Sequence, residues 1–286
     1  MLSGQRVAIV GMVVSGSLAV AKIAAGLAGH STAVVADGLE SAGDVFASGF
    51  VLLGLTLAAK PADKEHPYGH GRIETLTGLL IGLVLTAGGA LISFGSFQRV
   101  GLPRAPLAAF VVWPLAVSAL AKAGLDSFKF RYGRKLRSAA LTADAWNDTM
   151  DIVSALAALA AVGLTLSDPA RFLNADLYGG MMVGLIVIST GARVVYDTAM
   201  QLIDTMPDGQ RMDEIRAAAA TVAGVRGVEK CFARKTGLRY HVDLHLEVDP
   251  EMTVRRSHEI AHNVQLRIKE TLDWVADMLV HVEPTP

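Results

Sequence analysis

The chain has 286 residues, of which 52% are hydrophobic and 19% are charged, with a formal net charge of −1. No basic surplus is present, which argues against nucleic acid as a partner. The single cysteine, Cys231, excludes an intramolecular disulfide, and we interpret it as a small buried hydrophobic residue. The mean hydropathy of +0.41 is typical of a membrane protein.

Six long apolar segments predict six transmembrane helices, because about 20 helical residues cross the hydrocarbon core of a bilayer. Arg6 precedes the first segment, which is too long for an ordinary signal-peptide core, so we expect a retained span. We assign residues 1–206 to this membrane domain. The predicted spans are Val7–Gly29, Thr32–Ala59, Ile73–Phe97, Leu107–Phe128, Leu141–Leu166 and Leu177–Ile203.

Basic residues are distributed unequally among the links between these spans. They concentrate in the link between the second and third spans and in the link between the fourth and fifth. By the positive-inside rule these links are cytoplasmic, and so are both chain termini. We therefore expect a multi-pass integral membrane protein, placed in the inner (cell) membrane if the chain is bacterial.

Three carboxylates interrupt the second predicted span. Asp37, Glu40 and Asp44 are spaced i, i+3 and i+7, which places them on one helix face. One acidic side chain at mid-membrane costs about 2.5–3.5 kcal/mol on insertion scales, so a functional role is expected. Packing against a water-filled cavity or a neighbouring helix is the alternative, and it is strongest for the two outer residues, Asp37 here and Asp144 in the fifth span.

The fifth predicted span repeats this spacing with Asp144, Asn147 and Asp151. Two oxygen-lined faces in lipid can satisfy each other by meeting around a cation, so the pair predicts a metal site. Crowded carboxylates cannot all remain ionised when the site is empty, and an entering dication would displace their protons. If the spans rock between two orientations, export of a divalent metal against entry of protons follows.

The link between the second and third spans contains two histidines four residues apart. Asp63, His66 and His70 could form a second metal site, although this spacing also occurs in solvated loops. Lys122 and Asp126 in the fourth span are also four apart, and we expect them to pair within their helix. The sequence has no HExxH helix and no GxSxG elbow, which argues against a membrane metalloenzyme.

Hydropathy falls after residue 206, and residues 207–286 have the pattern of a soluble domain. The predicted order is helix, strand, strand, helix, strand, which suits a small antiparallel sheet with helices on one side. A domain of about 80 residues has a modest core and often dimerises. The elements are predicted at Met212–Ala223, Val225–Lys235, Arg239–Val248, Thr253–Leu272 and Asp277–Val282.

Together, the spans, the two acidic motifs, the histidine-bearing loop and the C-terminal domain resemble the cation diffusion facilitator family over nearly the whole chain. This family consists of membrane exporters of divalent transition metals. The resemblance implies six transmembrane helices, a cytoplasmic C-terminal α+β domain of ferredoxin-like pattern, a homodimer, metal–proton exchange and no enzymatic activity. It also implies a transport site of four side chains, which are Glu40, Asp44, Asn147 and Asp151.

Two of these four positions depart from the commonest zinc-transporting pattern, which has His or Asp first and His third. Glu40 and Asn147 make the set all oxygen, and oxygen ligands suit harder ions than Zn²⁺. We therefore favour Mn²⁺ or Fe²⁺ over Zn²⁺. The alternative is a transport-impaired metal sensor, or an assembly partner of another transporter.

The resemblance also implies roles outside the transport site. Asp63, His66 and His70 fall on positions that form a loop metal site in some members. Arg72 and Asp204 are implied to form an ion pair between spans, with two separate interfacial charges as the alternative. Four positions are implied to bind a regulatory metal: His245, His258, His281 and Glu283. His241 and His262 lack such support, and we expect them to be solvated.

Overall fold

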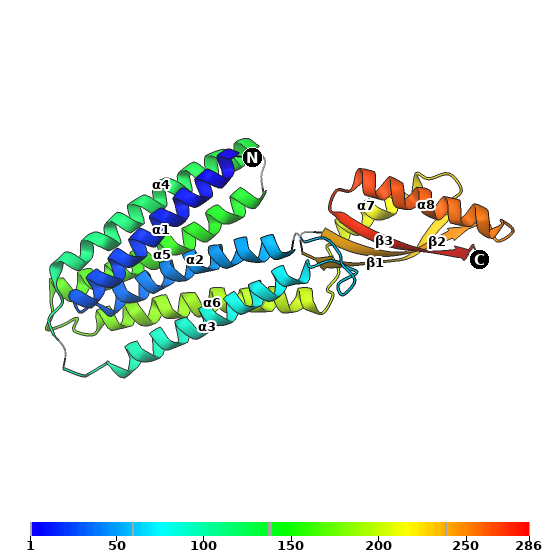
Figure 1. Ribbon diagram of the computed structural model, residues 1–286. Helices are drawn as coiled ribbons and strands as arrows, with labels where there is room; N and C mark the ends of the chain where they lie inside the picture. The colour runs from blue at the N-terminus through cyan, green and yellow to red at the C-terminus, as the bar shows by residue number, and fades with distance from the viewer. Residues whose placement is uncertain (1, 59, 104, 137–138, 238, 286) are drawn as a thin grey trace. The chain divides into compact units, whose positions relative to one another are not determined.

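A computed structural model gives the fold of the chain (Figure 1). It describes the backbone of residues 2–58, 60–103, 105–136, 139–237 and 239–285; side chains are not described at 2–12, 47–48, 50–52, 55, 58, 125–136 and 139–150. The chain divides into two compact units, residues 1–50 with 80–194 and residues 51–79 with 195–286. Because the second unit also takes in residues 51–79, the expected boundary between residues 206 and 207 stays a prediction.

Six helices of 25 to 29 residues occupy the first 202 residues of the described chain. Five of them follow the predicted spans within a few residues. The exception, α4, begins after a short 3-10 turn (Ala109–Val111) and continues through the basic stretch that we had assigned to a link, because Lys and Arg are good helix formers. The helices are α1 (Leu2–Ala28), α2 (Thr32–Ala58), α3 (Arg72–Gln98), α4 (Val112–Leu136), α5 (Ala139–Ser167) and α6 (Ala175–Leu202).

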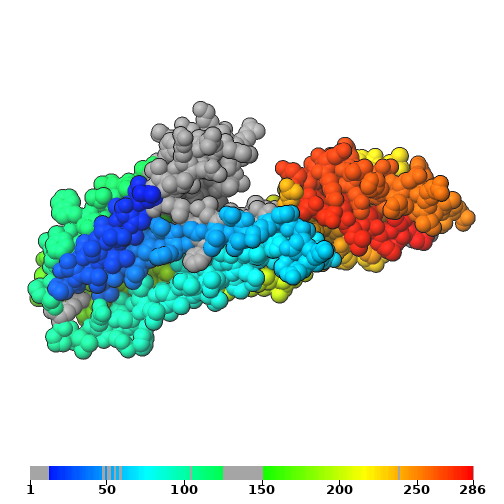
Figure 2. Space-filling model, viewed as in Figure 1, coloured from blue at the N-terminus to red at the C-terminus, as the bar shows by residue number. Residues whose placement is uncertain are grey.

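Two of these helices, within the described residues, are long and apolar enough to cross a membrane. They are α3 and α6, with mean hydropathies of 2.0 and 1.5, and shorter apolar stretches lie in α1, α5 and the start of α4. Figure 2 shows that much of the surface of α3, coloured cyan to green, is exposed on the visible face. An apolar surface of this extent suits lipid better than water. Its side chains that are more than half exposed include Leu76, Leu80, Leu83, Val84, Leu91, Phe94 and Phe97.

Glycines allow α3 and α6 to pack closely. A Cβ atom added to Gly89 would lie 2.6 Å from the carbonyl oxygen of Gly184, and one added to Gly191 would lie 2.6 Å from the backbone nitrogen of Thr86. Small residues let helix backbones approach in this way. The adjoining core of the first unit also consists mainly of small and branched side chains from α2, the 3-10 turn, α4, α5 and α6: Ala33, Val34, Ala36, Val111, Leu115, Ala158, Val162 and Val183.

The start of α2 is held by a buried carboxylate from α6. Asp176 accepts hydrogen bonds from Ser31 Oγ (2.5 Å) and from the backbone N–H of Thr32 (2.7 Å) and Ala33 (3.3 Å). The first N–H groups of a helix have no partner within it, and the helix dipole favours a negative charge there. This contact fixes the entry of α2, the helix that carries three of the predicted carboxylates.

The C-terminal part has the predicted order of elements and an α+β architecture. Its elements are α7 (Gly209–Ala220), β1 (Gly227–Thr236), β2 (Arg239–Val248), α8 (Val254–Thr271) and β3 (Val275–Pro284). The strands lie in the order β1-β2-β3, and β1 pairs antiparallel with β2. The prediction of a wholly antiparallel sheet was wrong, since β3 pairs parallel with β2. The reason is the crossover through α8, which returns the chain to the same end of the sheet.

Both helices of this part cover one face of the sheet (Figure 1). The alternation predicted for β2 is confirmed, because Val242, Leu244, Leu246 and Val248 are all buried there. Cys231 is 4% exposed and belongs to the same core, as its interpretation as a buried hydrophobic residue requires. The helices contribute Met212, Ile215, Ala219, Ile260, Val264 and Ile268 to that core.

Candidate metal centre

The acidic face of α2 points into the helix bundle. Asp37 is 1% exposed and Glu40 is 8% exposed, whereas Asp44 is partly buried. This face contacts α1, α4 and α5, because Asp37 pairs with Lys22, Asp44 lies near Lys122, and Glu40 accepts a hydrogen bond from Ser154. Buried carboxylates in an apolar bundle need partners, because an unpaired buried charge is costly.

Helix α5 supplies one of these partners, Ser154, and a further carboxylate, Asp151. Ser154 donates a hydrogen bond to Glu40 Oε2 (2.5 Å) and lies 3.4 Å from Asp37 Oδ1. One turn earlier lies Asp151, which is 8% exposed. The other predicted ligand on α5, Asn147, and the outer residue Asp144 lie outside the described side chains. We call Asp37, Glu40, Asp44 and Asp151 the acidic cluster.

A lysine from α4 joins α2 to α5. Lys122 Nζ lies 2.8 Å from Asp151 Oδ2 and 3.9 Å from Asp44 Oδ2, with Lys122 only 9% exposed. We had expected Lys122 to pair with Asp126, whose side chain is outside the described residues. The partner that the structure gives Lys122 is Asp151, on another helix, so tertiary packing rather than helical spacing selects its contact.

A second buried lysine lies on the other side of the cluster. Lys22 of α1 is fully buried, and its Nζ contacts Asp37 Oδ2 (2.6 Å), the Asp37 carbonyl oxygen (3.1 Å) and Ser41 Oγ (2.6 Å). Sequence reasoning missed this residue. The available signal was a lone lysine inside an apolar span, which by itself implies a partner on a neighbouring helix.

These contacts define the charge of the site. The acidic cluster has four carboxyl groups, whereas Lys22 and Lys122 bring two ammonium groups, so carboxyl groups outnumber the cationic side chains described at the site. In the described structure, the carboxylate oxygens of Glu40, Asp44 and Asp151 do not all lie within 4.8 Å of one another. Within the described residues, the cation that Asp151 contacts is therefore the ammonium of Lys122.

The loop histidines do come together. Asp63, His66 and His70 have ligand atoms that all lie within 4.8 Å of one another. Asp63 Oδ1 lies 3.2 Å from His66 Nδ1, and Asp63 Oδ2 lies 3.5 Å from His70 Nε2. Asp63 also accepts the backbone N–H of His66 at 2.7 Å, and this hydrogen bond lowers the pKa of the carboxyl. His70 Nδ1 is buried and has no hydrogen-bond partner among the residues that the structure describes. A carboxylate and two imidazoles suit a transition metal.

The loop that carries this group contacts the β1–β2 hairpin. The Tyr68 ring meets the His241 ring edge-on at 5.9 Å, and the Arg234 guanidinium lies 5.8 Å from the centre of the Tyr68 ring. We had expected His241 to be solvated, but it is half-buried under this loop. This burial lowers the pKa of His241, because the charged imidazolium is less favourable away from water.

Three of the four predicted regulatory ligands form a second group. His245, His281 and Glu283 have ligand atoms within 4.8 Å of one another, and His245 Nδ1 lies 2.5 Å from Glu283 Oε1. The parallel register aligns His245 on β2 with His281 on β3, which explains their meeting. His258 does not join them: it is exposed on α8, two residues before the buried Ile260 and so on nearly the opposite helix face.

The predicted ion pair between Arg72 and Asp204 is confirmed. The Arg72 guanidinium lies 2.9 Å from Asp204 Oδ1, joining the start of α3 to the residues that follow α6. Both side chains are about half exposed, so the pair contributes little to stability in water. Its role is better described as fixing the geometry of these two helix ends.

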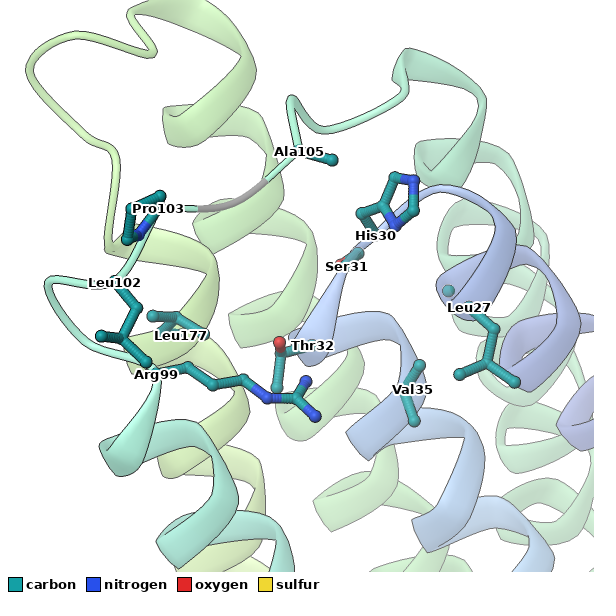
Figure 3. Close-up of a pocket in the computed structure, with 11 residues that line it drawn as sticks. Leu27, His30, Ser31, Thr32, Val35, Arg99, Leu102, Pro103, Ala105 and Leu177 are labelled. Carbon is teal, nitrogen blue, oxygen red and sulfur yellow. The ribbon is translucent and has the colours of Figure 1, made fainter.

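A cavity of about 470 Å³ lies apart from the acidic cluster, beside the turn between α1 and α2 (Figure 3). Its polar lining includes His30, Thr32 and Arg99, and Figure 3 shows the Arg99 side chain extending toward Thr32. None of the described residues that line it carries a carboxylate.

Comparison with known families covers almost the whole chain. The model of the cation efflux transmembrane domain matches residues 8–203, and the model of the cation efflux protein cytoplasmic domain matches residues 207–285. The regions with the acidic cluster and with the His245 group thus fall in different matched domains.

Individual relatives are similar over nearly the full length of this chain. Metal tolerance protein C1 of Arabidopsis thaliana is 30% identical over 98% of this chain, which spans 62% of that longer protein. The manganese efflux system protein MneP of Bacillus subtilis is 29% identical over 98% of this chain and 96% of its own length. Among solved structures, MamM-CTD 215-293 is 35% identical over 26% of this chain and 94% of that one, with a TM-score of 0.26.

Proposed function

Since the chain belongs to the cation diffusion facilitator family of divalent metal efflux transporters, we propose that it exports Mn²⁺ or Fe²⁺, in preference to Zn²⁺, in exchange for protons. Because it belongs to this family, the chain is a membrane protein that transports a metal cation. The identity of the metal, the exchange for protons and the residues that carry the metal are our proposal.

The buried acidic cluster is the observation that carries this proposal. Glu40 and Asp44 on α2 face Asp151 on α5, and each carboxylate sits among helices with an apolar exterior. We assign the transport site to these three residues and Asn147. Carboxylates buried in membrane helices most often mark ion pathways, and they need a cation to balance them.

The charge of the cluster supports a divalent cargo. The carboxylates of the acidic cluster outnumber the two ammonium groups beside them, and this excess of negative charge favours a divalent cation. Protons that bind these carboxylates after metal release would reduce the excess negative charge in turn, and this supports metal–proton exchange. The oxygen-only ligand set supports Mn²⁺ or Fe²⁺ over Zn²⁺, and a relative described as a manganese efflux protein agrees with this choice.

The proposed architecture has six membrane spans, α1 to α6, within residues 1–206. The lengths of these helices support it, because 25 or more helical residues can cross a bilayer. We place both chain termini in the cytoplasm, together with the domain formed by residues 207–286. Two copies of that small domain are proposed to associate, making the transporter a homodimer.

Regulation is assigned to the two groups outside the bundle. We propose that cytoplasmic metal binds Asp63, His66 and His70 in the loop and His245, His281 and Glu283 in the C-terminal domain. The donor sets fit a transition metal, since each combines two imidazoles with one carboxylate. Binding there would stabilise one arrangement of the loop and the sheet without entering the transport path.

Metal uptake into proteoliposomes tests the proposed function. The purified full chain is reconstituted, a proton gradient is imposed, and entry of Mn²⁺, Fe²⁺, Zn²⁺ and Co²⁺ is compared with the accompanying change in internal pH. We expect Mn²⁺ or Fe²⁺ to be transported fastest, with proton movement in the opposite direction. Absence of flux for every metal would favour the alternative, a transport-impaired sensor or assembly partner.

A further inference from the structure

The contacts of Lys122 place a fixed positive charge inside the proposed transport site. Its ammonium lies 2.8 Å from Asp151 Oδ2 and 3.9 Å from Asp44 Oδ2, and the lysine is 9% exposed. Asp44 Oδ2 is itself buried and has no hydrogen-bond partner among the described residues. The helix that carries Lys122, α4, supplies none of the proposed ligands.

We propose that Lys122 is a built-in competitor of the cargo: its ammonium occupies the transport site between loads, and an entering metal ion must displace it. The inference rests on the proposed function, because it concerns the same carboxylates. It assigns Lys122 a positioning role that sets metal affinity and promotes metal release.

Two physical arguments support displacement. A divalent transition metal binds carboxylate oxygens at about 2.0–2.2 Å, so it competes for the carboxylate of Asp151 that Lys122 now engages through Oδ2. An ammonium and a dication cannot both stay within a few ångströms of these oxygens, since like charges repel strongly where water is excluded. The metal-loaded and lysine-paired forms of Asp151 are therefore mutually exclusive.

The contacts of Lys22, the other buried lysine at the site, do not suit it to this role. Its ammonium is saturated by Asp37 Oδ2, the Asp37 carbonyl and Ser41 Oγ, and none of these is a proposed metal ligand. Lys22 can therefore keep its contacts whether or not metal is bound. Lys122, in contrast, must leave Asp151 in each transport cycle when the metal binds. When the metal leaves, the ammonium of Lys122 returns and again balances the charge of Asp151.

Removing the competitor has opposite effects on binding and on turnover. In Lys122→Met, the metal meets no competing charge, so its affinity rises, by about tenfold or more for a full charge removed within 4 Å. Release slows for the same reason, so kcat falls. A purely structural lysine would instead weaken binding or leave it unchanged.

The experiment measures Mn²⁺ binding by calorimetry on the purified full chain at pH 8, together with KM and kcat for Mn²⁺ uptake into vesicles. Binding at the loop and the C-terminal domain is subtracted with Asp151→Asn, which retains those groups. Ser118→Ala is the matched control, because Ser118 is buried one turn earlier on α4 and carries no charge. Lys122→Gln replaces Lys122→Met if the latter does not fold.

We expect the Lys122 variant to bind Mn²⁺ about tenfold more tightly, with lower KM and lower kcat, while Ser118→Ala behaves as wild type. A Kd and KM equal to those of wild type, or larger, would overturn the inference. Equal binding and flux by wild type and Asp151→Asn would instead overturn the proposed transport site itself, so the two failures are distinguishable.

Discussion

Lys22 Nζ and Asp37 Oδ2 lie 2.6 Å apart, and both side chains are at most 2% exposed. This ion pair joins α1 to α2 and neutralises the outermost carboxylate of the acidic face. It explains why Asp37 shares the spacing of Glu40 and Asp44 without sharing their role: its charge is already satisfied. The pair therefore distinguishes Asp37, whose charge is already compensated, from Glu40 and Asp44, which we propose as metal ligands.

Breaking this pair should destabilise the bundle. Lys22→Met leaves Asp37 buried and uncompensated, and loss of one partner of a buried pair typically costs about 3–5 kcal/mol. We expect a clear fall in the thermal unfolding midpoint of the full chain in detergent. The double variant Lys22→Met with Asp37→Leu should recover most of the loss, because no unpaired charge remains. Equal midpoints for the wild type and Lys22→Met would contradict this account.

The sequence predicted the helices and the acidic face because both depend on local pattern. Apolar runs marked α1 to α6, and the spacing of Asp37, Glu40 and Asp44 placed them on one face. The pairing of the lysines could not be predicted in this way. Lys122 had an acidic residue four positions away, yet its partner in the structure is Asp151, which only packing of α4 against α5 brings near.

The C-terminal domain shows the same division between local and tertiary information. Alternating residues identified β2, and the order of the elements was correct. The direction of β3 depended on how α8 crosses the sheet. Likewise, His245 and His281 meet because β2 and β3 are parallel and in register, while the exposed position of His258 follows from which face of α8 packs on the sheet.

Asn147 provides a prediction for selectivity. Asn147→His replaces an amide oxygen with an imidazole nitrogen, which Zn²⁺ prefers more strongly than Mn²⁺ does. We expect the ratio of Zn²⁺ to Mn²⁺ uptake to rise by about tenfold, on the scale of one changed ligand interaction. Competition between the two ions in proteoliposomes measures this ratio. Asn147→Asp, which keeps an oxygen ligand, should retain the wild-type preference; an unchanged ratio in Asn147→His would exclude Asn147 as a selectivity ligand.

Cys231 provides a prediction for the C-terminal core. Burial raises the pKa of its thiol from 9.0 to about 11, so the native thiol stays protonated and unreactive at pH 8. We expect labelling by a thiol reagent to be about 100-fold slower in the native chain than in the unfolded chain. Comparable labelling rates in the two states would contradict the burial of Cys231.

The same shift makes stability depend on pH. Above pH 9 the thiol ionises in the unfolded chain but not in the folded one, so the unfolded state binds fewer protons and stability falls as pH rises toward 11. Cys231→Ala removes this contribution. Its unfolding midpoint should therefore decline less between pH 9 and pH 11 than that of the wild type, and parallel declines would exclude the linkage.

The C-terminal metal group can be tested by ligand-linked stability. Metal bound only by the folded chain raises its unfolding midpoint in proportion to the logarithm of metal concentration. We expect Zn²⁺ or Mn²⁺ to stabilise the full chain, and Glu283→Gln to lose part of that effect because Glu283 contacts both His245 and His281. His258→Ala is the matched control and should respond as the wild type does. A full response in Glu283→Gln would remove this group from the account.

The most direct test of the transport site is Mn²⁺ uptake by Asp44→Asn and Asp151→Asn in proteoliposomes. Each substitution removes one carboxylate while conserving side-chain volume, and Asp213→Asn on the exposed face of α7 serves as the control. We predict that both site variants reconstitute normally yet lose at least about 100-fold in initial uptake rate, on the scale of losing a charged ligand, while the control transports as wild type. Uptake at the wild-type rate by both site variants would contradict the assignment of the buried carboxylates as the path of the metal.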